Sequence, residues 1–152
     1  MDNNNSPSNG LRLKTLFKEA GIKSTRLDAS RRVATFAGRT RDWSFIANLY
    51  NGWLHVQTYV CEIPGAAGLR AELLDVAMVA NQTMSLTKFV KSSALYLEVE
   101  YREEHVTPES LNNLIGLLHS NAEEYYPGLF RVVSGDAVLE SLAPPSLTNA
   151  AS

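Results

Sequence analysis

The dipeptide Asn51-Gly52 joins two runs of residues that alternate between apolar and polar side chains, at positions 42–50 and 53–63. Alternation with a period of two is typical of a strand with one buried face. A two-residue Asn-Gly loop favours a type I′ β-turn, which pairs Tyr50 with Trp53 and fixes every later pair of the hairpin. The sequence therefore predicts a hairpin and also which side chains share each of its faces.

The two predicted faces of this hairpin differ in character. One face is mainly apolar and is expected to be core: Trp43, Phe45, Ala47, Leu49, Leu54, Val56, Thr58 and Val60. The other mixes aromatic and polar side chains: Ser44, Ile46, Asn48, Tyr50, Trp53, His55, Gln57 and Tyr59. Aromatic rings with polar edges are favoured on surfaces that become dry when a partner binds. We expect a partner-binding surface made of Ile46, Tyr50, Trp53, His55 and Tyr59, or else a face covered by another segment of the same chain.

Helical and strand patterns recur along the rest of the chain. Apolar residues at helical spacing predict helices at residues 11–20 and 69–83, and a third that starts at Pro108 after Thr107 and ends before Pro127. Strands are predicted at residues 31–37, 87–91 and 94–102 in addition to the Asn-Gly hairpin. If the last strand continues the same sheet, Tyr96 extends the partner-binding surface, with Glu98 and Glu100 at its margin. Residues 129–142 give no decisive pattern, and a short strand and a helical turn are expected there.

The order of these elements indicates an α+β fold. Strands joined in hairpins, rather than alternating with helices, favour an antiparallel sheet with the helices packed against it. The expected arrangement is α-β-β-β-α-β-β-α, with about five strands and three helices in a single domain at residues 11–142. Residues 1–10 and 143–152 are rich in Asn, Ser, Pro, Gly or Ala and are expected to be disordered tails.

The charge is unevenly distributed along the chain. The net charge is −2 and the pI about 5.9, yet residues 1–41 hold nine basic and three acidic residues. This asymmetry fits an anionic partner, charge complementarity within the fold, or contact between subunits. The low pI argues against nucleic acid. No apolar run approaches the roughly 20 residues of a membrane span, no secretory signal is visible, and Cys61 is the single cysteine, so we expect a cytoplasmic protein.

The sequence carries no recognisable catalytic or metal-binding motif. His55, His105 and His119 lack the spacing of a metal site, and Cys61 is the only thiol. The segment Pro-Gly-Ala-Ala-Gly at 64–68 precedes a helix but lacks the lysine of a phosphate-binding loop. We therefore expect neither an enzyme nor a cofactor, and no metal.

Five segments together resemble the YbjN family of bacterial proteins and, more distantly, the class I type III secretion chaperones. They are LKTLFKEAGI, WSFIANLYNGWLHVQTYV, LLDVAMVANQTMSLTKF, ALYLEVEYR and VTPESLNNLIGLLHSNAEEYYPGL. The resemblance implies a non-enzymatic homodimer that holds an extended or partly unfolded segment of another protein. It also implies a dimer contact on the second helix, where Leu74 and Met78 lie off the apolar stripe. The alternative is a small-molecule-binding regulatory domain with its pocket between sheet and helices.

Overall fold

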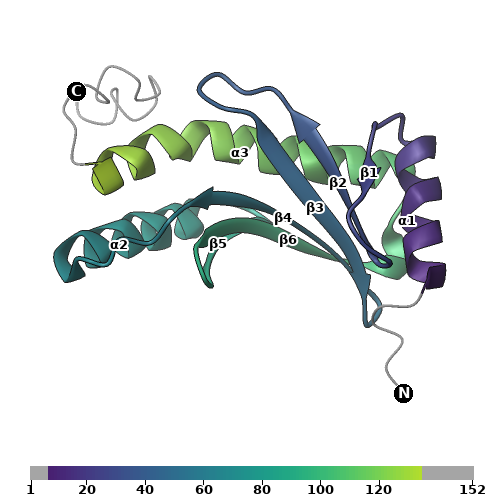
Figure 1. Ribbon diagram of the computed structural model, residues 1–152, viewed down its shortest axis with the longest axis horizontal. Helices are drawn as coiled ribbons and strands as arrows, with labels where there is room; N and C mark the ends of the chain where they lie inside the picture. The colour runs from purple at the N-terminus through teal and green to yellow at the C-terminus, as the bar shows by residue number, and fades with distance from the viewer. Residues whose placement is uncertain (1–6, 135–152) are drawn as a thin grey trace.

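The structure, a computed structural model, describes residues 7–134 (Figure 1). Within this range a six-stranded antiparallel sheet has the order β1-β2-β3-β4-β6-β5. Its strands are β1 (Thr25–Arg26), β2 (Arg31–Phe36), β3 (Trp43–Tyr50), β4 (Trp53–Cys61), β5 (Lys88–Lys91) and β6 (Leu95–Arg102). The helices are α1 (Pro7–Glu19), α2 (Ala67–Thr83) and α3 (Pro108–Ser134), with the short 3₁₀ helix η1 (Glu103–His105) before α3. The predicted α+β fold is confirmed.

The Asn-Gly turn sets the hairpin register as predicted. Asn51 and Gly52 have φ values of 51° and 79°, the positive values that a type I′ turn requires at both central residues. Tyr50 pairs with Trp53, and the following pairs up to Phe45 with Thr58 keep that register. β6 then pairs with β4, with Tyr59 opposite Tyr96, so the second hairpin extends the same sheet.

The core lies between one face of the sheet and the three helices. The inner face is almost sealed from solvent and is formed by Trp43, Phe45, Ala47, Leu49, Leu54, Val56, Val60, Leu95, Leu97 and Val99. These residues form one cluster with Leu13 and Phe17 of α1, Leu73 of α2, and the apolar stripe of α3. Figure 1 shows α3 running along the sheet, with α1 at one end of the molecule and α2 at the other. All three helices therefore cover the same face.

The prediction that the last helix ends before Pro127 is wrong, because α3 continues through Pro127 to Ser134. Proline has no N–H, so the carbonyl oxygen four residues earlier, that of Glu123, loses its usual helical donor. Arg39 replaces that donor: its Nη2 donates to the Glu123 carbonyl oxygen at 3.2 Å. Burial of Pro127 and Leu129 then makes continuation of the helix favourable.

Two further boundaries differ from the predictions. α1 begins at Pro7, so residues 7–10, which the sequence placed in a tail, belong to a helix. β1 was not predicted, since it has only two residues and both are exposed. Residues 1–6 and 135–152, which include the predicted tail at 143–152 and part of the undecided segment 129–142, lie outside the described range. Across residues 7–134, no helix is both long enough and apolar enough to span a bilayer.

Candidate functional site

The sheet face opposite the helices carries the predicted partner-binding residues. We call it the outer face, and it is formed by Ile46, Asn48, Tyr50, Trp53, His55, Gln57, Tyr59, Tyr96, Glu98 and Glu100. Tyr50, Trp53 and Tyr59 keep 45%, 37% and 37% of their surface exposed. Because the three described helices all pack on the inner face, none of them covers these rings. The outer face is thus open over residues 7–134.

One end of the outer face centres on Tyr59. Its ring meets the Tyr96 ring edge-on, with centroids 6.0 Å apart, and the Arg41 guanidinium lies 5.6 Å from the Tyr59 centroid. The Tyr59 hydroxyl donates to Glu62 Oε1 at 3.0 Å. Burial and then this hydrogen bond raise the pKa of Tyr59 to about 12. The hydroxyl therefore stays protonated near neutral pH and remains a donor.

The other end of the outer face contains a pocket beside the Asn-Gly turn. Its volume is about 480 Å³ and its walls are Asn48, Tyr50, Asn51, Trp53, His55 and Glu100. The Arg102 guanidinium lies 5.0 Å from the Trp53 ring centroid, a distance at which a cation is attracted to an aromatic face. This end therefore offers two exposed rings beside acidic and amide groups.

Between the two ends, β4 and β6 bring His55 together with two glutamates. Glu100 lies directly opposite His55, and His55 Nε2 is 2.8 Å from Glu98 Oε2. The sequence pattern predicts the two glutamates at the margin of the surface and does not connect them with His55. Only the β4–β6 register brings them together, and no turn with a fixed pairing rule joins these two strands.

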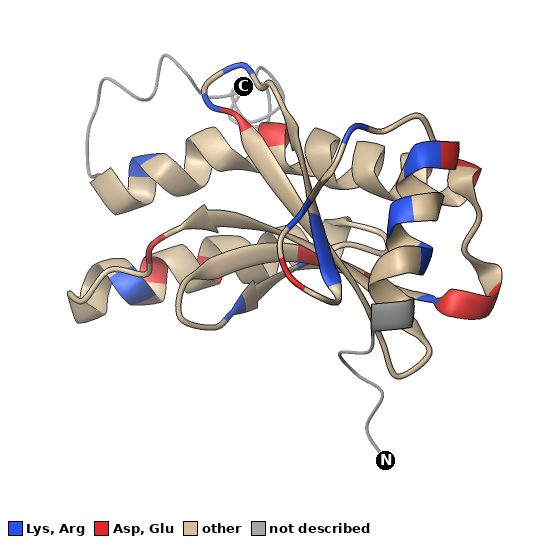
Figure 2. Ribbon diagram, turned by 45° about the vertical axis from the view of Figure 1, so that its right-hand side comes forward, with Lys and Arg blue, Asp and Glu red and all other residues tan. Residues whose placement is uncertain are grey.

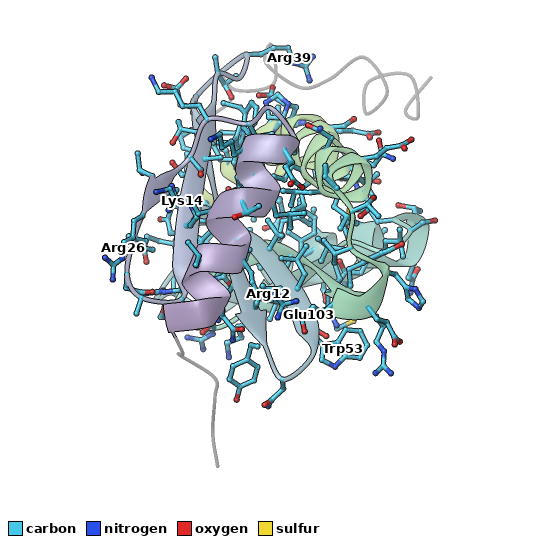
Figure 3. The ribbon with its side chains drawn as sticks, turned by 90° about the vertical axis from the view of Figure 1, so that its right-hand side faces the viewer. Arg12, Lys14, Arg26, Arg39, Trp53 and Glu103 are labelled. Carbon is cyan, nitrogen blue, oxygen red and sulfur yellow. The ribbon has the colours of Figure 1, made fainter. Side chains whose placement is uncertain are left out.

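A second concave site lies along α1, and we call it the α1 groove. It has a volume of about 370 Å³ and is lined by Leu11, Arg12, Thr15, Leu16, Glu19, Leu49, Glu103 and Val106. Arg12 forms an ion pair with Glu103 across it, as Figure 3 shows, and Trp53 lies at the same end of the molecule. The backbone N–H of Glu103 donates to the Gly52 carbonyl at 2.9 Å. The α1 groove and the Trp53 end of the outer face thus meet at the hairpin tip.

The residues expected at a dimer contact lie on α2. Met78 and its neighbour Val79 are exposed, whereas Leu74 is half-buried. Leu86, just beyond the helix, is also exposed, with a φ of 67°. Contiguous exposed apolar patches mark contact surfaces, and these exposed residues lie on α2 and just after it.

Cys61 is buried, and burial raises the pKa of its thiol to about 11, which disfavours the reactive thiolate.

Figure 2 shows basic residues gathered on α1, β2 and the neighbouring loops. Arg12 and Arg39 of this basic region pair with Glu103 and Glu123 of the acidic remainder. Part of the charge asymmetry is therefore complementarity within the fold.

Comparison with solved structures identifies chains of the same fold. A chain of the heterodimeric ExoU–SpcU complex from the type III secretion system of Pseudomonas aeruginosa aligns with a TM-score of 0.50 and 17% identity, covering 74% of this chain and 93% of that one. A chain of the HopA1–SchA chaperone–effector complex aligns with a TM-score of 0.52 and 9% identity, covering 80% and 94%. The fold is that of the aligned chain in each of these two complexes. No protein-family model matches the sequence, so the YbjN resemblance stays a prediction, and no curated protein matches it either.

Proposed function

We propose that this protein is a non-enzymatic, chaperone-like module that captures a segment of a partner protein on the outer face. The observation that carries the proposal is the exposure of three rings with polar edges, Tyr50, Trp53 and Tyr59, on one continuous sheet surface. Such rings supply large contact area and carry polar groups at their edges, which in the free state bind water or, for Tyr59, Glu62. The fold is shared with a chain of a type III secretion complex and a chain of a chaperone–effector complex, and this likeness supports the same proposal.

The partner-binding residues in this proposal are Ile46, Tyr50, Trp53, His55, Tyr59 and Tyr96. An extended segment laid across β3, β4 and β6 would meet the Tyr59–Tyr96 pair at one end and the Trp53 pocket at the other. The α1 groove then offers a second contact beyond the hairpin tip, with its exposed Leu11 and half-buried Leu16. We further propose a homodimer through Leu74 and Met78 of α2.

A small-molecule-binding regulatory domain is the second candidate, and the α1 groove is the observation that favours it. A volume of about 370 Å³ falls within the range of ligand pockets. This candidate predicts a saturable rise in melting temperature with a metabolite and no capture of protein.

The proposed function is tested by removing two of the exposed rings. Tyr50 and Trp53 are suitable because they are exposed, whereas Tyr59 also contacts Tyr96, Arg41 and Glu62. The variant Tyr50→Ala/Trp53→Ala is compared with wild type for capture of proteins from the native lysate. Loss of captured proteins with retained folding supports the proposal.

A further inference from the structure

The outer face brings three side chains that commonly bind metals into one cluster. The ring nitrogen of His55 and one carboxylate oxygen each from Glu98 and Glu100 all lie within 4.8 Å of one another. His55 belongs to β4 and both glutamates belong to β6, two strands paired along most of their length. The donors are thus carried by sheet backbone rather than by loops, which holds a site more rigidly.

The spacing of these donors suits a single ion. Nitrogen and oxygen ligands stand roughly 2.0 to 2.2 Å from a transition metal, so neighbouring ligands are about 3 Å apart. The His55 Nε2 and Glu98 Oε2 atoms are 2.8 Å apart, close to that separation. Glu100, directly opposite His55 and exposed, offers a third donor atom within 4.8 Å of the other two.

Asn48 provides an independent observation at the same place. It pairs directly with His55 across β3 and β4 and lines the same pocket of about 480 Å³. Its Oδ1 is inaccessible to solvent and accepts no hydrogen bond among the described residues. A buried amide oxygen without a donor is costly, so Asn48 leaves an unsatisfied polar group next to His55. Asn48, His55 and Glu100 therefore form a row across three strands, with Glu98 beside it.

We propose that this cluster binds one divalent transition metal ion of the Zn²⁺ class. The imidazole is the discriminating ligand, because Mg²⁺ and Ca²⁺ prefer oxygen donors alone whereas zinc accepts nitrogen and carboxylate oxygen together. Partial burial supports binding, since the Glu98 side chain is only 12% exposed and that of His55 27%. The inference goes beyond the proposed function, because it concerns a metal ion and is tested without a protein partner, although His55 belongs to both sites.

The competing account is a simple hydrogen bond or ion pair between His55 and Glu98, with Glu100 solvated. In that account the hydrogen-bonding groups of both residues are satisfied without a metal. Another histidine beside a glutamate in the same chain serves as the control. His105 Nε2 lies 3.6 Å from Glu104 Oε1 and both side chains are largely exposed. His105→Ala thus removes a histidine with one acidic neighbour but leaves the cluster intact.

The test is titration of tag-free, chelator-treated, full-length protein with Zn²⁺ by calorimetry, with Co²⁺ absorption as a second readout and Mg²⁺ as a comparison ion. We expect one Zn²⁺ ion to bind per chain and Mg²⁺ to give no comparable heat of binding. The affinity for Zn²⁺ should be about tenfold or more lower in His55→Ala and in Glu100→Gln. His105→Ala should bind as wild type does. Glu100→Gln keeps an exposed side chain of the same shape, so it remains informative if His55→Ala fails to fold. Absence of saturable Zn²⁺ binding, or wild-type affinity in either cluster variant, overturns the proposal.

Discussion

Arg39 and Glu123 lock the loop after β2 to the middle of α3. The Arg39 backbone N–H and Nε both donate to the Glu123 carboxylate, at 3.0 and 3.2 Å, while Nη2 donates to the Glu123 carbonyl oxygen that Pro127 leaves without a helical partner. The indole Nε1 of Trp43 donates to the same carboxylate at 2.9 Å. One glutamate thus joins β3, the loop and the helix, and supports the sheet that displays the outer face.

This arrangement predicts a pH-dependent stability. Burial alone would raise the pKa of Glu123, but hydrogen bonds from Trp43 and Arg39 outweigh it and lower the pKa below its ordinary 4.5. A carboxyl with a lowered folded-state pKa contributes stability above its unfolded pKa, and this stability is lost as pH falls through the folded value. We expect Glu123→Gln to unfold about 1 to 3 kcal/mol more easily at pH 7.

Thermal unfolding of wild type and Glu123→Gln between pH 7 and pH 3 checks this prediction. The difference in melting temperature between the two should shrink as pH falls below about 4.5. Glu104→Gln, at a largely exposed position, is the control and should change little. A melting-temperature difference between wild type and Glu123→Gln that is equal at pH 7 and pH 3 would mean that Glu123 does not stabilise the fold through its charge.

Gly38 is predicted to accept no side chain. A Cβ at this position would overlap the Glu123 carboxylate and the Arg41 carbonyl oxygen, and would lie 2.9 Å from Trp43 Cδ1. Overpacking against backbone cannot be relieved by a rotamer change, so we expect Gly38→Ala to cost about 2 kcal/mol or more in urea unfolding. Gly65→Ala meets no atom within 4 Å and should be close to neutral. Equal urea midpoints for Gly38→Ala and Gly65→Ala would contradict the close contact of the Gly38 backbone with Glu123, Arg41 and Trp43.

The α2 surface predicts a change in oligomeric state. If Met78 is buried between two copies, Met78→Asp places a charge in an apolar contact and should shift the protein to a 16.7 kDa monomer. Sedimentation velocity at several concentrations measures this, with Leu11→Asp, an exposed leucine on α1, as the control. A wild-type protein that sediments as a monomer throughout would exclude the homodimer.

The sequence predicted the hairpin pairing well because one turn determined it. Asn51 and Gly52 tolerate positive φ, and from that turn each inward or outward side chain follows by counting. The continuation of α3 past Pro127 was not predictable in the same way. It depends on Arg39, which lies 84 residues from Glu123, and no local pattern reveals that contact.

The candidate site was predicted only in part for a similar reason. The rings of Tyr50, Trp53 and Tyr59 lie on the hairpin whose register the turn sets, so their shared face was foreseeable. The approach of Glu98 to His55 depends on how β6 pairs with β4, where the register also shifts between Tyr59 and Cys61. Such pairing between distant segments is decided by packing of the whole sheet.

The most direct test of the outer face compares two double variants with matched exposure. Tyr50→Ala/Trp53→Ala removes outer-face rings that are 45% and 37% exposed, and Leu27→Ala/Leu69→Ala removes side chains that are 46% and 37% exposed elsewhere. Quantitative mass spectrometry of proteins captured from the native lysate is the measurement, with urea unfolding of each variant beside it. We predict at least a tenfold loss of captured partner for the outer-face variant alone, with stability within about 1 kcal/mol of wild type. Undiminished capture by that variant, or equal loss in both, would contradict a binding role for this face.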